Sequence, residues 1–321
     1  MLKQGGRNGG GYGRHPPTAP NMNFNFLRYR KIYFIFSGIL VLASLIWLII
    51  FGLNPGIEFS GGSILELEFK EKVLSNQEIL EKISDLGLGR VFVQPAGQSG
   101  VILRMKDISE NTHQEVIERL KGLSELEEKR FESIGPVIGR ELKQKTKIVV
   151  ILALASILLY IAFAFRKVQR PIPSWQYGFA SLIALVHDVL IPLGIFSVLG
   201  RFWGVQITIP VICALLTVFG YSINNTVVVF DRIRENLLKG IGVDFEDTVN
   251  VSLNQTLSRS INTSLTTLFV LFAIFFWGGE TLRYFSLALI LGISFGTYSS
   301  LFLANPILVS WLKWRERRYK T

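Results

Sequence analysis

Six long apolar segments constrain this chain more than any other feature of its sequence. A transmembrane helix needs roughly 20 mostly apolar residues to cross about 30 Å of hydrocarbon, and each segment meets or approaches that length. The segments are residues 32–53, 148–165, 177–199, 207–230, 260–279 and 284–312. No small-residue cleavage pattern follows the first segment, which is therefore expected to be a retained anchor. The sequence predicts a membrane α-helical protein with six transmembrane helices.

The charged residues divide the chain into two parts of different character. Residues 57–147 hold 14 of the 34 Lys and Arg but 16 of the 24 Asp and Glu. They are therefore expected to form a soluble, slightly acidic domain inserted between the first and second helices. The net charge of +10 comes from short segments beside the apolar runs, which favours membrane orientation over nucleic-acid binding.

Lys and Arg in the short flanking segments predict the orientation, because positively charged segments resist translocation. Six of them precede the first apolar segment, five follow the last, and the loops at 166–176 and 231–259 carry more. The opposite short loops hold only Arg201 and Arg283. Both termini are therefore expected in the cytoplasm, with residues 57–147 exported and the chain resident in the cytoplasmic membrane.

The expected organisation has five parts. The Gly- and Pro-rich first 23 residues lack an apolar periodicity to bury, so they are expected to be disordered. From the N-terminus, the parts are a disordered cytoplasmic tail, the first transmembrane region, the exported domain, a five-helix transmembrane bundle and a basic cytoplasmic tail, at residues 1–23, 24–56, 57–147, 148–312 and 313–321.

The exported domain alternates its patterns in the order strand, helix, strand, strand, helix, strand. Ser75 followed by Glu78 has the spacing of a capping box, which opens an amphipathic helix. The second helix is expected at residues 109–123, and the strands are expected at residues 63–69, 90–94, 101–105 and 129–134. This order predicts a small α+β domain of the ferredoxin-like, split βαβ type.

Polar groups inside the apolar segments are the most informative residues, because ionisable side chains in hydrocarbon are costly unless they are satisfied. Asp188 lies roughly 16 Å from the cytoplasmic end of the third segment, near the middle of the bilayer. His187 precedes it by about 100° around the helix, so its side chain can face elsewhere. Asp188 is a candidate for an ion pathway or, less favoured, for a purely structural role.

The fourth and fifth segments each carry a stripe of polar residues at helical spacing. The stripes are Thr217, Tyr221, Asn224 and Asn225, and Arg259, Asn262, Thr263 and Thr266. Counted from the exported ends, Asn225 and Arg259 both lie about 27 to 30 Å deep, so the two residues can meet.

Purely structural explanations of these polar residues also stay open. The stripes can serve as polar packing contacts between helices, and Arg259 can extend its side chain to the cytoplasmic interface. Gly292 and Gly296 form a GxxxG pattern, which favours a close helix contact.

Motifs of soluble enzymes are absent from the sequence. It has no P-loop, no HExxH, no dinucleotide fingerprint and no Cys or His spacing typical of a metal site. The single cysteine, Cys213, excludes an intramolecular disulfide. We therefore expect no enzymatic activity, no metal and no cofactor.

Five stretches together resemble the SecF family, the smaller subunits of the bacterial SecDF complex, within the resistance-nodulation-division superfamily. They are residues 56–62 (GIEFSGG), 133–136 with 139–142, 186–188 (VHD), 220–236 and 254–260. The resemblance extends over about residues 27–312. It implies a SecD partner that brings the number of spans to twelve, and exported domains that pull or hold a preprotein leaving the Sec translocon channel. It also implies that the proton gradient drives this work.

Two positions depart from the pattern that the resemblance implies. Glu58 stands where the family usually has Asp. Asn225 also stands where the family has Asp, a carboxylate that the resemblance assigns to proton conduction together with the arginine at Arg259. An amide does not titrate, whereas a buried carboxyl group can.

Three explanations for Asn225 stay open. The chain is a neutralised variant that mimics the protonated state, or it conducts through Asp188 or the partner's carboxylate, or it couples to another ion through neutral oxygens. The sequence does not separate these explanations.

The leading hypothesis is a non-enzymatic, ion-coupled subunit of protein export. Its ion pathway runs along Asp188, Asn225 and Arg259, with hydrogen bonds from Thr226 and Asn262. Gly61 and Gly62 are expected to permit a tight connection from the membrane into the first strand. The expected partners are a SecD-like subunit, the translocon, the preprotein and membrane lipid, without nucleic acid. The alternatives are a small-molecule exporter or half-exporter of the same superfamily, and a passive scaffold.

Overall fold

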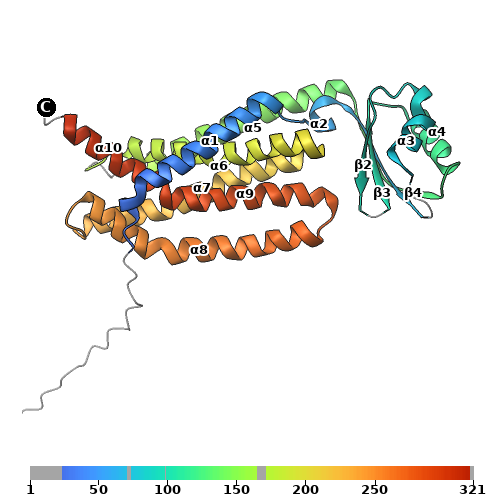
Figure 1. Cartoon of the computed structure of the whole chain (residues 1–321). Helices are drawn as coiled ribbons and strands as arrows, with labels where there is room; N and C mark the ends of the chain where they lie inside the picture. Colours follow the sequence, from blue (N-terminus) through green and yellow to red (C-terminus); the bar gives the residue numbers. More distant parts are fainter. Residues whose placement is uncertain (1–23, 71–73, 98, 165–170, 319–321) are drawn as a thin grey trace, which may run out of the picture.

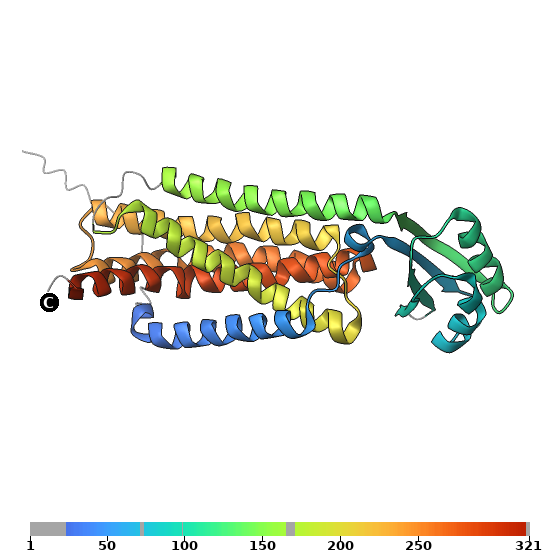
Figure 2. The same cartoon turned by 90° about the horizontal axis from the view of Figure 1, so that it is seen from above.

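The computed structural model describes residues 24–70, 74–97, 99–164 and 171–318. The expected disordered tail at 1–23 and the last residues of the expected basic tail lie outside the described residues. A long helical bundle carries a small α+β domain at one end (Figures 1 and 2). The outer ends of α1 and α10 lie at the opposite end of the bundle (Figure 1).

Within the described residues, six helical spans are long and apolar enough to cross a membrane, which confirms the prediction of six transmembrane helices. A short 3-10 helix, η1 (Phe26–Tyr29), precedes the first of them. The spans are formed by α1 (Arg30–Phe51), α5 (Pro136–Ala164), α6 (Ser174–Trp203), α7 (Ile209–Leu238), α8 (Phe245–Trp277) and α9 (Glu280–Phe302) continued by α10 (Ala304–Arg318).

The last span is broken, whereas the sequence predicts one continuous helix at 284–312. The break falls at Leu303, with φ −121° and ψ −58°. Pro306 explains it, because proline has no N–H for the carbonyl group of Phe302 and its ring displaces that carbonyl group. The side-chain amide of Asn305 donates to the carbonyl oxygen of Ser300 at 2.5 Å, which satisfies a backbone group beside the break.

The helices differ in how much of their surface the bundle covers. α6, α7 and α9 pack on one another, with α7 also against α8 and α1 against α6. α1 and α5 instead expose large apolar side chains such as Ile49 and Leu159, as helices in contact with lipid do. α5 begins at Pro136, so residues 136–147 are helical although the sequence assigns them to the exported domain.

The α+β domain consists of α2 (Ile57–Ser60), β1 (Gly62–Phe69), α3 (Asn76–Ile83), η2 (Ser84–Leu86), β2 (Phe92–Ala96), β3 (Gly100–Met105), α4 (Glu110–Lys121) and β4 (Leu126–Ile134). Its four strands are antiparallel in the order β2-β3-β1-β4. This order is that of a split βαβ domain and confirms the predicted fold. The capping box is present, since Ser75 and Glu78 each accept a hydrogen bond from the other's backbone N–H.

Side chains alternate along the strands, so one face of the sheet forms the core of the domain. Leu65 and Leu67 of β1 and Leu103 of β3 are fully buried against Ile79 of α3 and Leu120 of α4. Both helices lie on the side away from the bundle, which leaves the other face of the sheet toward the membrane helices (Figure 1).

Two short connections hold the domain to the bundle. Ile207, before α7, donates its N–H to the carbonyl oxygen of Asn54 at 2.7 Å and accepts from Gly56 at 2.9 Å. Gly61 and Gly62 follow with φ +75° and +136°. A Cβ atom at Gly61 would lie 2.9 Å from Cα of Pro136, and one at Gly62 2.7 Å from the carbonyl oxygen of Met105. Glycine is therefore required where β1 begins beside α5.

Candidate functional site in the membrane bundle

Asp188 is the fully buried centre of a polar cluster between α6, α7 and α9. Its Oδ2 atom accepts hydrogen bonds from Oγ of Ser222 on α7 at 2.5 Å and from Oγ of Ser299 on α9 at 2.7 Å. Its Oδ1 atom lies 2.9 Å from Nδ1 of His187. Three helices thus supply the hydrogen bonds that a carboxyl group needs in hydrocarbon.

Two glycines on α9 make this close packing possible. A Cβ atom at Gly292 would overlap the methyl groups of Val218 on α7. One at Gly296 would lie 3.2 Å from Cβ of Ser222 and 3.4 Å from Oδ2 of Asp188. The GxxxG pattern therefore lies against α7, and Gly296 borders the carboxyl group directly.

Hydroxyl groups continue the cluster along the seam between α7 and α9. Oγ1 of Thr226 lies 2.9 Å from Oγ of Ser300 and also donates to the carbonyl oxygen of Ser222 at 3.1 Å. Oγ of Ser264 on α8 lies 2.6 Å from Oγ1 of Thr297. Each hydroxyl group can both donate and accept a hydrogen bond. These groups can therefore form a chain of hydrogen bonds.

His187 belongs to the cluster, although its sequence position allowed another face. Its ring is buried, and the ring nitrogen nearest the backbone reaches the neighbouring carboxyl group. The ring also stacks on Tyr298 with centroids 6.0 Å apart. The Tyr298 hydroxyl in turn lies 3.3 Å from Oγ of Ser37, which connects the cluster to α1.

Asn225 is 3% exposed and lies one turn after Ser222 on α7. Within the described residues, its Nδ2 atom has no hydrogen-bond partner. A buried amide without an acceptor costs about 1–3 kcal/mol. The side chain at this position is thus enclosed in the bundle and incompletely satisfied.

Arg259 and Asn262 lie apart from the buried cluster, on the exposed surface of α8. Among the residues that the structure describes, Arg259 forms no ion pair. Thr217 and Asn224 are exposed on neighbouring α7. The structure therefore groups Asp188 and Thr226 with the buried seam, and leaves Arg259 and Asn262 exposed on α8. Polar groups exposed in this way are unfavourable against lipid.

Sequence reasoning missed the serines that hold Asp188. Ser222 and Ser299 are ordinary small polar residues in apolar helices, and Ser also occurs at many helix contacts. The signals available were the position of Ser222 one turn before Asn225 and of Ser299 beside the GxxxG pattern.

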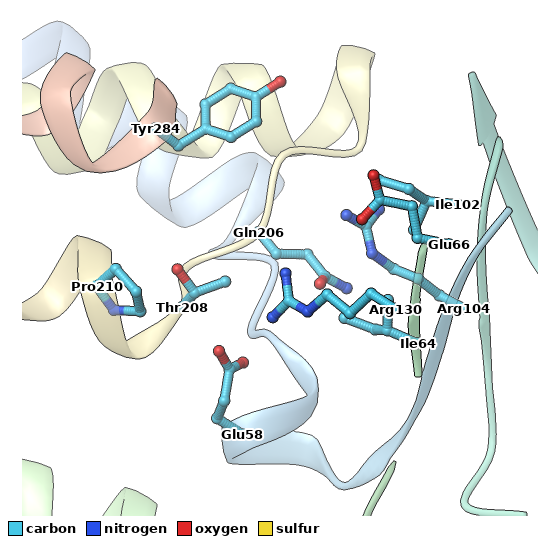
Figure 3. Close-up of a pocket in the computed structure, with 10 residues that line it drawn as sticks. All are labelled: Glu58, Ile64, Glu66, Ile102, Arg104, Arg130, Gln206, Thr208, Pro210 and Tyr284. Atoms are coloured by element: carbon cyan, nitrogen blue, oxygen red, sulfur yellow. The ribbon is translucent and has the colours of Figure 1, made fainter. Parts of the chain in front are cut away.

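A second polar site lies where the sheet faces the bundle. A cavity of about 100 Å³ is lined there by four charged side chains, with Gln206, Thr208 and Tyr284 from the bundle side (Figure 3). The charged residues are Glu58, Glu66, Arg104 and Arg130. Arg130 donates from Nε to Oε1 of Glu132 at 2.8 Å. Charged and polar side chains from both the sheet and the bundle therefore meet at this junction.

The part of the chain that the structure describes contains no group of three or more His, Cys, Asp or Glu residues placed to hold a metal ion.

Two family models match the chain. The one described as "Protein export membrane protein SecD/SecF, C-terminal" matches residues 114–314, and the one described as "SecD/SecF GG Motif" matches residues 46–73. The second match covers the glycines that begin β1.

Curated relatives carry the name "Protein translocase subunit SecF". The relative from Thermobaculum terrenum is 42% identical over 300 residues, covering 89% of this chain and 93% of its own. The one from Anaerolinea thermophila is 38% identical, covering 91% and 96%. The one from Haemophilus influenzae is 38% identical, covering 88% and 84%.

Two solved structures of SecDF also resemble this chain. One, of the translocon-associated membrane protein SecDF from Thermus, matches with a TM-score of 0.81 at 32% identity over 92% of this chain. A SecDF structure in a super-membrane-facing form matches with a TM-score of 0.67 at 32% identity over 94% of this chain. This chain spans 40% of the length of each SecDF chain.

Proposed function

The chain belongs to the SecF family of protein translocase subunits, and from that premise we propose that it couples an ion gradient to protein export together with a SecD-type partner. The observation that carries the proposal is the enclosure of Asp188 by donors from three elements. A carboxyl group held by hydroxyl groups can gain or lose a proton without losing its contacts, because hydroxyl groups donate as well as accept.

The ion is a proton in this proposal, and Asp188 is its binding group within this chain. Ser222 and Ser299 position the carboxyl group, and Thr226 with Ser300 extends the polar seam along α7. Asn225 lies on the same helix with an unsatisfied amide. An aspartate at that position would add a second titratable group to the same seam.

The partner lies against the exposed polar residues of α7 and α8. Arg259 and Asn262 on α8 and Thr217 and Asn224 on α7 are exposed there, and polar groups in hydrocarbon require partners. The SecDF chain that this protein matches is more than twice as long as the matched part, which supports a second helical subunit. In this assembly Arg259 pairs with a carboxyl group of the partner.

In this proposal, ion coupling moves the α+β domain relative to the bundle at the junction between them. That junction is polar, and the two SecDF structures match this chain unequally, with TM-scores of 0.81 and 0.67. One proton crossing a potential of 100 mV releases about 2.3 kcal/mol, against about 1 kcal/mol for a typical hydrogen bond. A few protons therefore suffice to rearrange such a junction and move the domain against a preprotein leaving the translocon.

The same proposal places the protein in the bacterial cytoplasmic membrane with both ends in the cytoplasm. The start of α1 and the end of α10 lie at one end of the bundle and the α+β domain lies at the other (Figure 1). The Lys- and Arg-rich flanks belong to the end where α1 starts and α10 ends. Accessibility of a single introduced cysteine to an impermeant reagent tests the orientation.

The decisive experiment compares Asp188→Asn with Asp231→Asn in proteoliposomes and in an export assay, each with the SecD-type partner. Asp231 is an exposed carboxylate on the same helix bundle, so it controls for loss of one charge. We expect Asp188→Asn to abolish proton flux and gradient-stimulated export while co-purification with the partner persists. Unchanged export in both variants would instead indicate a passive scaffold.

The alternative of a small-molecule exporter is less well supported, because drug sites are usually roomy and apolar. The cavity of about 100 Å³ at the junction has four charged residues in its lining, and the larger cleft of about 590 Å³ beside it has three arginines. Extrusion of a lipophilic dye from vesicles that contain the chain and its partner distinguishes the two functions.

A further inference from the structure

A basic cleft lies between the α+β domain and the exported ends of the membrane helices. It has a volume of about 590 Å³. Its walls come from β2 and the adjoining residues of the domain, from the end of α1, and from the end of α6 with the loop that follows. β2 is an edge strand of the sheet. The cleft is separate from the buried cluster around Asp188.

The charged residues in the lining of the cleft are all basic. Its lining residues include Arg90, Arg104 and Arg201 but no Asp or Glu. Arg90 and Arg201 are exposed, and neither forms an ion pair with any residue in the described part of the chain. Arg90 lies over the ring of Phe92, 4.7 Å from its centroid. The cleft therefore favours an anion.

The cleft also borders exposed aromatic side chains at the end of α6. Phe202 and Trp203 end α6 with exposed fractions of 65% and 64%, as aromatic residues at the membrane–water boundary do. The ring of Phe202 packs edge-on against Phe51 at the end of α1, with centroids 5.7 Å apart. Arg201 directly precedes these aromatics. Phosphates of the outer leaflet are present at the membrane–water boundary at high local concentration.

We propose that this cleft binds the headgroup of an anionic phospholipid from the leaflet on the exported side. The phosphate pairs with the guanidinium groups of Arg90 and Arg201, which present forked donors suited to phosphate. The acyl chains lie along Phe202 and Trp203. Because Arg90 belongs to the α+β domain and Arg201 to α6, the bound lipid ties the domain to the bundle in the position seen here.

A polypeptide is a weaker candidate for the same cleft. The free edge of β2 can pair with an extended segment, but an exported chain carries charges of both signs, whereas the cleft carries one. The lipid assignment does not depend on ion coupling. Its failure is therefore distinguishable from failure of the proposed function.

The test measures binding of phosphatidylglycerol to the full-length protein in detergent by native mass spectrometry. Arg90→Gln and Arg201→Gln are each expected to weaken binding about fivefold, since one basic residue near the surface contributes about that factor. The double variant is expected to lose at least tenfold. Arg201→Lys keeps the charge but loses the forked donors, so its binding is expected to lie between that of the parent and that of Arg201→Gln.

Arg283→Gln is the matched control, because Arg283 is the other basic residue of the short exported loops and lies over Phe275 at 5.4 Å, outside the cleft. An equal loss of phosphatidylglycerol binding in Arg283→Gln, or no loss in the double variant, would overturn the proposed lipid site. Inorganic phosphate at millimolar concentration is the second arm. Displacement of the lipid by phosphate alone overturns the need for a membrane-bound ligand.

A photoreactive residue at Phe92 identifies the occupant in membranes. A lipid adduct supports the proposal, and an adduct with an exporting polypeptide in place of lipid overturns it.

Discussion

Ser299 on α9 donates a 2.7 Å hydrogen bond to Asp188 on α6, although the two residues are 111 positions apart in the sequence. With Ser222 on α7, it closes a fully buried polar contact between three membrane helices. The same contact is therefore a source of helix association and, in the proposed function, the binding place of the coupling ion.

Removing either serine is expected to destabilise the bundle. Ser222→Ala and Ser299→Ala each leave an oxygen of Asp188 with one donor fewer, which costs about 1–3 kcal/mol in a buried site. Titration with denaturing detergent, followed by circular dichroism, measures the change in unfolding free energy. Ser181→Ala is the control, because Ser181 is equally buried but donates only to Tyr177 of its own helix. An effect in the control as large as that of the pair would contradict a specific role for the carboxyl group.

Gly292→Ala is expected to push α7 and α9 apart. Its Cβ atom would overlap the side chain of Val218, and overpacking of this kind costs about 1–3 kcal/mol. The additional change Val218→Ala provides room and is expected to restore most of the stability. Gly38→Ala is the matched control, since no atom lies within 4 Å of the added Cβ atom there. The measurement is the thermal unfolding temperature in detergent of the parent, Gly292→Ala, Gly292→Ala with Val218→Ala, and Gly38→Ala.

Asn225→Asp is expected to add a titratable group to the seam that contains Asp188. Proton flux through liposomes that contain the chain and its SecD-type partner is then expected to rise and to acquire a new dependence on pH. If flux and pH profile stay unchanged, the aspartate implied by the family resemblance has no part here. Asp188 or the partner's carboxylate then carries conduction alone.

The α+β domain is expected to lose stability in acid through Glu68. A hydrogen bond from Lys129, at 2.9 Å, holds the pKa of the Glu68 carboxyl group below its usual range. A lowered pKa in the folded state contributes stability above the unfolded pKa of about 4.3, and this stability is lost as the pH falls through the folded value. Glu68→Gln is therefore expected to flatten the acid dependence of unfolding between about pH 5 and pH 3.

Glu118→Gln is the control for this prediction, because Glu118 forms no ion pair with any residue that the structure describes. The ion pair of Glu68 is exposed, so the difference between the two variants is also expected to shrink at high salt. Hydrogen exchange of the backbone amides in the α+β domain, which requires no tryptophan signal, measures the unfolding of this domain. An identical acid profile in Glu68→Gln and the parent would refute the assignment.

For most residues of the candidate site, the sequence predicts only how deep in the bilayer each one lies. Counting residues along a helix places Asp188 near mid-bilayer and Asn225 level with Arg259, because the rise per residue is fixed. It does not give the rotation of one helix against another. The structure turns Asp188 inward and leaves Arg259 exposed on α8.

Hydropathy, side-chain alternation and capping are properties of single segments. The six spans, the glycine pair at the start of β1 and the β-α-β-β-α-β domain could therefore be predicted from the sequence. The sequence did not predict that His187, Ser222 and Ser299 surround Asp188 or that Arg90 and Arg201 line one cleft. These contacts join residues from separate elements. They depend on which helices are neighbours and how closely Gly292 and Gly296 let them approach, which no single segment encodes.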